Sequence, residues 1–143
     1  MTETDIVNFA GLTGDYNPQN VDAEFARASM FGERIAHGML VFSIACGLSM
    51  RLRDRYQRPK RRFAGLINDR VTFLVPVKIG DTIRCRYKTI STRISNSKPE
   101  VGLITFGIQV VNHRDEVVQE GFQIQMIPSR AGLDMQSSKT DRG

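Results

Sequence analysis

The chain has 143 residues, of which 41% are hydrophobic and 24% are charged, and its formal net charge is +5. These proportions are ordinary for one globular domain and exclude a disordered chain. The most apolar stretch, residues 35–50, is shorter than the ~20 residues of a membrane span, and the polar start has no secretory signal pattern. We therefore expect a cytoplasmic protein.

The N-terminal part predicts short helices around a loop. Residues 4–12 fit a helix with an apolar side, and residues 13–20 are so rich in turn residues that we expect a loop. Asp22 is a suitable N-cap for a second helix that runs to Arg27, with Phe25 as its apolar anchor.

The longest helix is predicted from Ile35 to about Arg53. Its apolar residues do not form one stripe but surround the helix: Met39, Leu40, Val41, Phe42, Ile44, Leu48 and Leu52. A helix that is apolar on every side belongs in the centre of a fold.

After Pro59 the hydrophobic period changes to two, which predicts strands. Apolar residues alternate with polar ones at 71–75 and 83–88, residues 103–111 form an apolar run, and Val118, Phe122, Ile124 and Met126 face away from Gln119, Gln123 and Gln125. Short connections between them predict an antiparallel meander with one buried face. Helices followed by strands indicate the α+β class, with one domain over residues 1–127 and a polar, flexible tail over 128–143.

The two cysteines, Cys46 and Cys85, lie far apart in unlike contexts. Their positions match no metal-ligand spacing and no disulfide framework, so we expect two reduced, partly buried thiols and no metal site.

The most specific signal lies in the first forty residues. Asp15, Asn17 and Pro18 are followed by Phe25-Ala26 and by the run Ile35-Ala-His-Gly-Met-Leu40. This pattern resembles the MaoC-like dehydratases and (R)-specific enoyl-CoA hydratases, in which Asp-x-Asn-Pro-x-His precedes Phe-Ala and then Ile-x-His-Gly-Met. The resemblance extends over roughly residues 4–127, because the strand pattern at 71–77 and Gly80-Asp81 also match.

The resemblance implies a hotdog fold, in which an antiparallel sheet wraps around a long central helix. It implies a hydro-lyase that reversibly adds water to a trans-2-enoyl thioester, with coenzyme A or acyl carrier protein as the carrier part of the substrate and no other cofactor. It also implies a homodimer or higher homo-oligomer. Family members usually have a strand before the first helix, and this chain reaches the helix almost at once, so one sheet edge would need a cover.

Catalytic roles follow residue by residue. A carboxylate on a half-buried loop can act as a general base toward water, and Asp15 is the candidate; alternatively, Asp15 only forms an Asx turn before Asn17. Asn17 matches the amide that orients the reacting groups, or it holds the loop.

His37 and Gly38 open the central helix, where unpaired N–H groups and the macrodipole favour negative charge. Gly38 matches the oxyanion-hole position and leaves room for a thioester carbonyl. His37 is a candidate substrate-binding residue or a satisfied structural histidine. Ser43 matches an active-site serine, or it bonds a carbonyl of the preceding turn.

The chain departs from the family at Asn20, where the pattern has its second catalytic residue, a histidine. An amide can hold water but cannot take up and release a proton near neutral pH. We therefore expect a slow hydratase, an enzyme of a different reaction, or a thioester-binding protein without turnover. A hotdog thioesterase is a third alternative, but it leaves the hydratase-like loop unexplained.

A basic run follows the central helix: Arg51, Arg53, Arg55, Arg58, Lys60, Arg61 and Arg62. Guanidinium groups suit phosphates, so Arg58, Arg61 and Arg62 are candidates to bind the phosphates of coenzyme A. The alternative is a solvated loop. Nucleic-acid binding is disfavoured, because few aromatic residues interleave and no recognition motif is present.

Overall fold

The computed structural model describes residues 1–56 and 65–133, apart from the side chains of residues 52–56. Helices come first in the chain and strands follow: α1 (Glu3–Thr13), α2 (Pro18–Val21), α3 (Ala23–Arg27), α4 (Gly38–Tyr56), β1 (Gly65–Phe73), β2 (Ile83–Ile94), β3 (Val101–Asn112) and β4 (Val117–Pro128). The α+β order expected from the sequence is confirmed.

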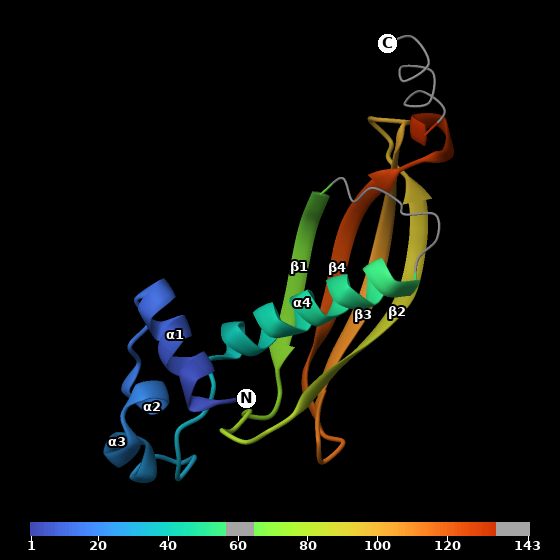
Figure 1. Ribbon diagram of the computed structural model, residues 1–143. Coiled ribbons are helices and arrows are strands. Elements are labelled where there is room, and N and C mark those ends of the chain that lie inside the picture. Colours follow the sequence, from blue (N-terminus) through green and yellow to red (C-terminus); the bar gives the residue numbers. More distant parts are fainter. Residues whose placement is uncertain (57–64, 134–143) are drawn as a thin grey trace.

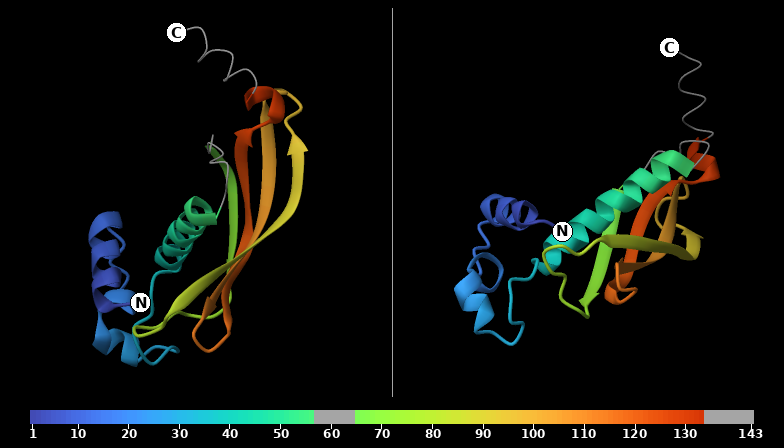
Figure 2. Two further views of the ribbon diagram at one scale, coloured as in Figure 1. Left: turned by 45° about the vertical axis from the view of Figure 1, so that its right-hand side comes forward. Right: turned by 60° about the horizontal axis from the view of Figure 1, so that its bottom comes forward.

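The strands form one antiparallel sheet in the order β1-β4-β3-β2. The sheet is curved, and α4 lies across its concave side, while α1, α2 and α3 gather beyond the N-terminal end of α4 (Figures 1 and 2). This is the sheet-around-helix arrangement that the resemblance implies.

The predicted meander is right for three strands and wrong for the fourth. Strands β2, β3 and β4 are sequential neighbours, but β1 pairs with β4 and lies at the opposite edge from β2. Residues 74–82 carry the chain from one edge to the other. Alternation along a strand identifies its two faces but says nothing about which strand lies beside it, so the sequence could not show this crossover.

The N-terminal helices agree with the sequence in outline. The Asp22 side chain caps α3 by accepting from the N–H groups of Glu24 and Phe25. Two expectations are wrong: residues 18–21 of the predicted loop form α2, and Phe25 is 53% exposed whereas its neighbour Ala26 is fully buried. Pro18 at the first helical position, behind an asparagine cap, explains the extra turn.

Helix α4 begins at Gly38 rather than Ile35. The preceding residues are extended, because Ile35 forms a bridge with Lys78 and the Ala36 N–H donates to the Val77 carbonyl at 2.8 Å. The helix is also less enclosed than predicted. Within the protomer one side is exposed, with Met39, Ser43, Gly47 and Met50 along it.

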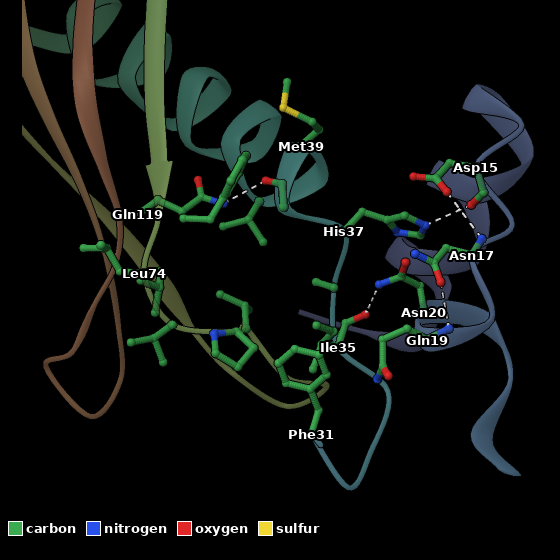
Figure 3. A pocket seen from close by; sticks show the side chains of 18 residues that line it. Asp15, Asn17, Gln19, Asn20, Phe31, Ile35, His37, Met39, Leu74 and Gln119 are labelled. Atoms are coloured by element: carbon green, nitrogen blue, oxygen red, sulfur yellow. Dashed lines mark hydrogen bonds between the residues drawn. The ribbon is translucent and has the colours of Figure 1, made fainter. Parts of the chain in front are cut away.

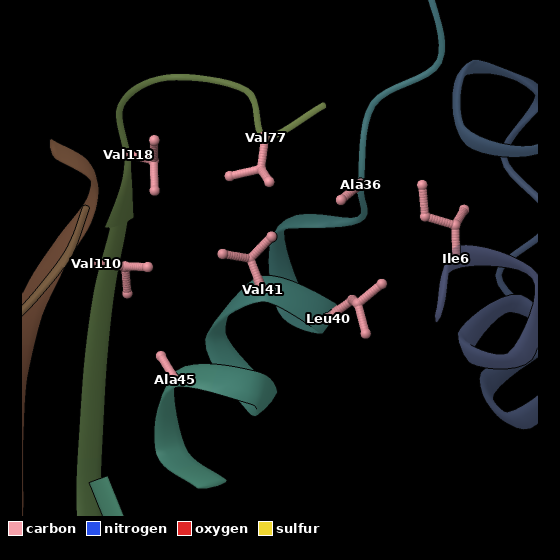
Figure 4. Packing of buried hydrophobic residues seen from close by; sticks show 8 residues of the cluster. All are labelled: Ile6, Ala36, Leu40, Val41, Ala45, Val77, Val110 and Val118. Atoms are coloured by element: carbon pink, nitrogen blue, oxygen red, sulfur yellow. The ribbon is translucent and has the colours of Figure 1, made fainter. Parts of the chain in front are cut away.

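The core lies where the start of α4 meets α1 and the sheet (Figure 4). It contains mainly small and β-branched side chains: Ile6, Ala36, Leu40, Val41, Ala45, Val77, Val110 and Val118. Residues 36–41 pack against Ile6 of α1 on one side and against Val110 and Val118 of the sheet on the other. This packing fixes the position of the α4 N-terminus relative to the sheet.

Strand β4 faces α4 with its glutamines. Gln119, Gln123 and Gln125 are 3–4% exposed. Gln123 accepts from the Tyr87 hydroxyl at 2.9 Å and donates to the Asp69 carboxylate at 2.8 Å. The inward face of the sheet is therefore partly polar, and these bonds compensate for burying the amides.

Both cysteines are free and half-buried, as expected. Burial, and secondarily the proximity of Cys46, raises the pKa of the Cys85 thiol to about 11. Burial also raises the pKa of Cys46.

The first residues after β4 are fixed. The Ser129 hydroxyl donates to the Pro99 carbonyl at 2.7 Å, and its N–H donates to the Glu100 carbonyl at 2.8 Å. The rest of the predicted tail, residues 134–143, lies outside the described residues. In the part of the chain that is described, no helix has the length and apolar character needed to cross a membrane.

Candidate active site

A cavity of about 540 Å³ lies between the N-terminal loop, the start of α4 and the sheet (Figure 3). One wall is formed by the α1–α2 loop with Asp15 and Asn17 and by Asn20 of α2. The opposite wall is formed by residues 73–77 together with Val118 and Gln119. His37 and Gly38 lie between these walls. Five of the residues proposed from the sequence thus line one cavity within a single protomer.

Asp15 stands on the loop between α1 and α2. Its Oδ1 accepts from the N–H of Asn17 at 3.3 Å, which is an Asx turn, while the side chain stays exposed. The Asx turn uses only one carboxylate oxygen of Asp15. Asp15 can therefore form the turn and also act as a general base. The second oxygen remains available to a ligand.

The two asparagines are held differently. The Oδ1 of Asn17 caps α2 by accepting from the Gln19 N–H at 3.0 Å. Asn20 is buried, and its amide nitrogen donates to the Ile35 carbonyl at 2.8 Å. That bond fixes the amide orientation, and the Asn20 oxygen has no protein donor among the described residues.

His37 connects the loop to the helix. Its ring is 5% exposed, lies 5.1 Å from the Phe9 ring centroid, and has its Nε2 3.0 Å from the backbone oxygen of Asp15. Because a carbonyl oxygen only accepts, Nε2 must carry a proton and donate it to the Asp15 oxygen. His37 thus holds Asp15 in place next to Gly38.

Gly38 is the first residue of α4, where the backbone N–H groups have no helical acceptor. A Cβ built on Gly38 would lie only 2.7 Å from the Phe73 ring. The expected free space over Gly38 is therefore occupied by Phe73, which is itself 53% exposed. Glycine is needed here because the ring packs against its Cα.

Gln119 reaches the same place from β4. Its Nε2 donates to the Gly38 carbonyl at 2.7 Å. Among the described residues, the buried side-chain atoms without a hydrogen-bond partner are His37 Nδ1 and Gln119 Oε1. Both belong to residues that line this cavity, and such atoms in a native protein call for an explanation.

Ser43 and the arginines are not part of this group. The Ser43 hydroxyl donates to the Met39 carbonyl at 2.8 Å on the exposed side of α4, and Ser43 does not line the cavity. Five residues along a helix correspond to about 140° of rotation, which turns Ser43 away from the Gly38 side. Arg58, Arg61 and Arg62 lie outside the described residues.

Sequence reasoning missed the sheet wall, above all Phe73 and Gln119. The sequence did contain one signal for Gln119. Glutamines alternate with apolar residues along β4, and such a row of glutamines is unusual for the solvent-exposed face of a strand. The described residues contain no group of three or more His, Cys, Asp or Glu positioned to hold a metal ion.

The fold and the site together define a hotdog protein of the α+β class with a polar loop facing a helix N-terminus. The MaoC like domain model matches residues 1–119, and the chain belongs to that family. An (R)-specific enoyl-CoA hydratase of Rhodospirillum rubrum is 34% identical over 130 residues, which cover 91% of this chain and 82% of the relative. Protein MaoC of Klebsiella aerogenes is 44% identical over 94 residues, but the match spans only 27% of its length.

Solved structures agree. An Archaeoglobus structure titled monoamine oxidase regulatory protein superposes with a TM-score of 0.79 at 37% identity, over 90% of this chain and 83% of that one. A Mycobacterium tuberculosis protein described as a double hotdog fold has a TM-score of 0.75 at 19% identity, over 90% of this chain and 38% of its own, and supports the fold alone.

Proposed function

We propose that the protein is an (R)-specific enoyl-CoA hydratase that adds water reversibly to a trans-2-enoyl thioester. The observation that carries the proposal is the cavity itself: the carboxylate loop and the α4 N-terminus both line it, and His37, the residue before Gly38, bonds to the backbone oxygen of Asp15. The names of the relatives support the same reaction.

The reaction needs a base for water and a place for negative charge. Asp15 takes a proton from water as the oxygen bonds to C3 of the enoyl group, and the electron pair moves through C2 to the thioester oxygen. The N–H groups at the start of α4 stabilise that oxygen. Asp15 then returns the proton to C2, so that one water is added and no further cofactor is consumed.

Asn20 changes the efficiency of this step and not its geometry. Its amide oxygen, which is without a protein donor in the described part of the chain, can accept the second hydrogen of the attacking water. It cannot exchange protons, so Asp15 alone must serve as base and then as acid. General acid–base groups contribute about 10²–10⁴-fold each, and we therefore expect a slow hydratase.

The alternative is a thioester-binding protein without turnover. Asn20 supports this alternative, because an amide cannot take up and release a proton. One experiment separates the candidates: the recombinant protein is mixed with crotonyl-CoA while enoyl absorbance and free thiol are followed. Loss of enoyl absorbance with the thioester retained means hydration. Release of free thiol means hydrolysis. Binding of crotonyl-CoA with neither change means a thioester-binding protein without turnover. Acyl-carrier-protein thioesters are tested in parallel.

We also propose that the protein is a homodimer or a higher homo-oligomer. Apolar side chains at the mouth of the cavity are about half exposed in the protomer, namely Met39, Phe73 and Leu74. A second copy would remove this surface from water. Sedimentation analysis tests this, and a monomer at micromolar concentration would contradict it.

A further inference from the structure

We propose that Gln119 is a further substrate-binding residue, whose amide oxygen accepts a hydrogen bond from an N–H or O–H donor of the bound thioester. The inference deepens the proposed function and rests on it. It starts from the one wall of the cavity that the sequence motif does not supply.

The orientation of the Gln119 amide follows from its partner. The Gly38 carbonyl only accepts, so the group 2.7 Å from it must be the amide nitrogen of Gln119. This bond holds Oε1 in a fixed position at the start of α4. The glutamine therefore presents its amide oxygen, an acceptor, at that point.

The amide oxygen is buried, and no described residue donates a hydrogen bond to it. A buried acceptor without a donor is costly, whereas the neighbouring buried amide on the same strand face, Gln123, accepts from Tyr87 and donates to Asp69. The two glutamines thus differ in one respect, which is that the cavity residue lacks a donor. A ligand donor would satisfy Oε1.

Access to the oxygen depends on Phe73. Phe73 pairs with Gln119 across the β1–β4 ladder, its ring contacts Gly38, and it is 53% exposed. A half-exposed ring can turn outward into solvent, and turning would uncover Gly38 and Gln119 together. The thioester carbonyl at the α4 N-terminus and a donor at Gln119 would then bind side by side.

Two parts of an acyl thioester carry such donors: the amide N–H of the pantetheine arm and the hydroxyl of the 3-hydroxyacyl product. Three ligands separate them. S-ethyl butanethioate has neither donor, S-butanoyl-N-acetylcysteamine has the amide alone, and S-ethyl (R)-3-hydroxybutanethioate has the hydroxyl alone.

The dissociation constants of these ligands are measured by NMR titration for the wild type and for Gln119→Met, which keeps the length of the side chain but loses the amide. We expect about 3- to 10-fold weaker binding by the variant for one donor-bearing ligand, and a change under twofold for S-ethyl butanethioate. The ligand that responds identifies the donor. Equal ratios for all three ligands would overturn the inference.

Gln123→Met is the matched control, because it removes a buried, fully paired amide outside the cavity and should weaken all three ligands equally or not at all. If Gln119→Met does not fold, as judged by circular dichroism, Gln119→Leu replaces it. In the wild type, the Gln119 side-chain amide resonance should shift with the responding ligand alone.

The two failures can be told apart. A wild type that hydrates crotonyl-CoA while Gln119→Met shows no ligand dependence overturns the inference and leaves the proposed function intact. A wild type that neither hydrates crotonyl-CoA nor binds any of the three ligands overturns both.

Discussion

Two polar clusters with buried members are built in opposite ways in this protein. The first lines the cavity, where His37 Nδ1 and Gln119 Oε1 have no hydrogen-bond partner among the described residues. The second, here called the Asp81 cluster, consists of Asp81, Asn112, Arg114 and Glu116 at the turns next to β2 and between β3 and β4. Asp81 is 3% exposed and accepts from Arg114 at 2.8 Å and from the Lys78 N–H at 3.0 Å.

The Asp81 cluster satisfies its polar atoms. Asn112 is fully buried, yet its oxygen accepts from the N–H groups of Arg114 and Glu116 at 3.0 Å and its nitrogen donates to the Glu116 carboxylate at 2.7 Å. Burial by itself would raise the pKa of Asp81, but the bonds from Arg114 and Lys78 outweigh it and hold that pKa below 3.8. Saturated polar groups stabilise a fold, whereas an unsaturated buried group calls for an explanation, which we propose here to be a ligand.

The largest effect should come from Asp15→Asn. We expect kcat/KM for crotonyl-CoA to fall by about 10²–10⁴-fold, because asparagine cannot accept the proton of water. Stability should change by less than about 0.5 kcal/mol, since the asparagine oxygen can still accept from the Asn17 N–H and the site is exposed. Steady-state kinetics measures the change in kcat/KM, and thermal melts measure the change in stability. Unchanged activity would remove Asp15 from the mechanism.

Asn20→His should act in the opposite direction and raise kcat/KM by about 10²-fold. An imidazole can donate one N–H to the Ile35 carbonyl, as the amide does, and present its other nitrogen to the cavity. The rate should acquire a pH dependence near the histidine pKa of about 6.5. A variant that binds the thioester but stays inactive would contradict a latent hydratase site.

Gly38→Ala tests the contact between the two walls. The new methyl group would lie 2.7 Å from the Phe73 ring, so we expect a loss of about 1–3 kcal/mol in the free energy of unfolding. Adding Phe73→Ala should restore part of that loss, because it removes the ring that clashes. Denaturant titrations of the single and double variants measure it, and strict additivity would show that the ring is not the obstacle.

Asp81→Asn should destabilise the fold by about 1–2 kcal/mol at neutral pH and leave hydration unchanged. Because the folded pKa of Asp81 is lowered, its contribution is present above the unfolded pKa and is lost as pH falls through the folded value. The difference between wild type and variant should therefore be constant above about pH 5 and shrink below pH 4.

The exposed neighbour Asp115, paired with Arg84 and Arg86, supplies the control. Asp115→Asn should cost under about 0.5 kcal/mol, because exposed ion pairs contribute little. Asparagine also tolerates the positive φ of 68° at this position. A gap between wild type and Asp81→Asn that persisted to pH 2 would contradict the assigned role of Asp81.

The sequence by itself determined the local features of the protein. Asp22 as a helix cap, the Asx turn at Asp15 and the alternation along β2 and β4 depend on neighbours a few residues apart, so each could be predicted from the chain. The motif around Asp15 and Gly38 also indicates the family from the sequence alone.

Only the tertiary structure decided what lies across the cavity. Phe73 and Gln119 are 46 positions apart and become neighbours because β1 crosses the sheet to pair with β4. It likewise decided that Phe25 is exposed and that Ser43 faces away from the site. Strand order results from packing the whole core at once, and hydrophobic periodicity carries no information about it. Nor does periodicity fix the rotation of a helix whose apolar residues surround it.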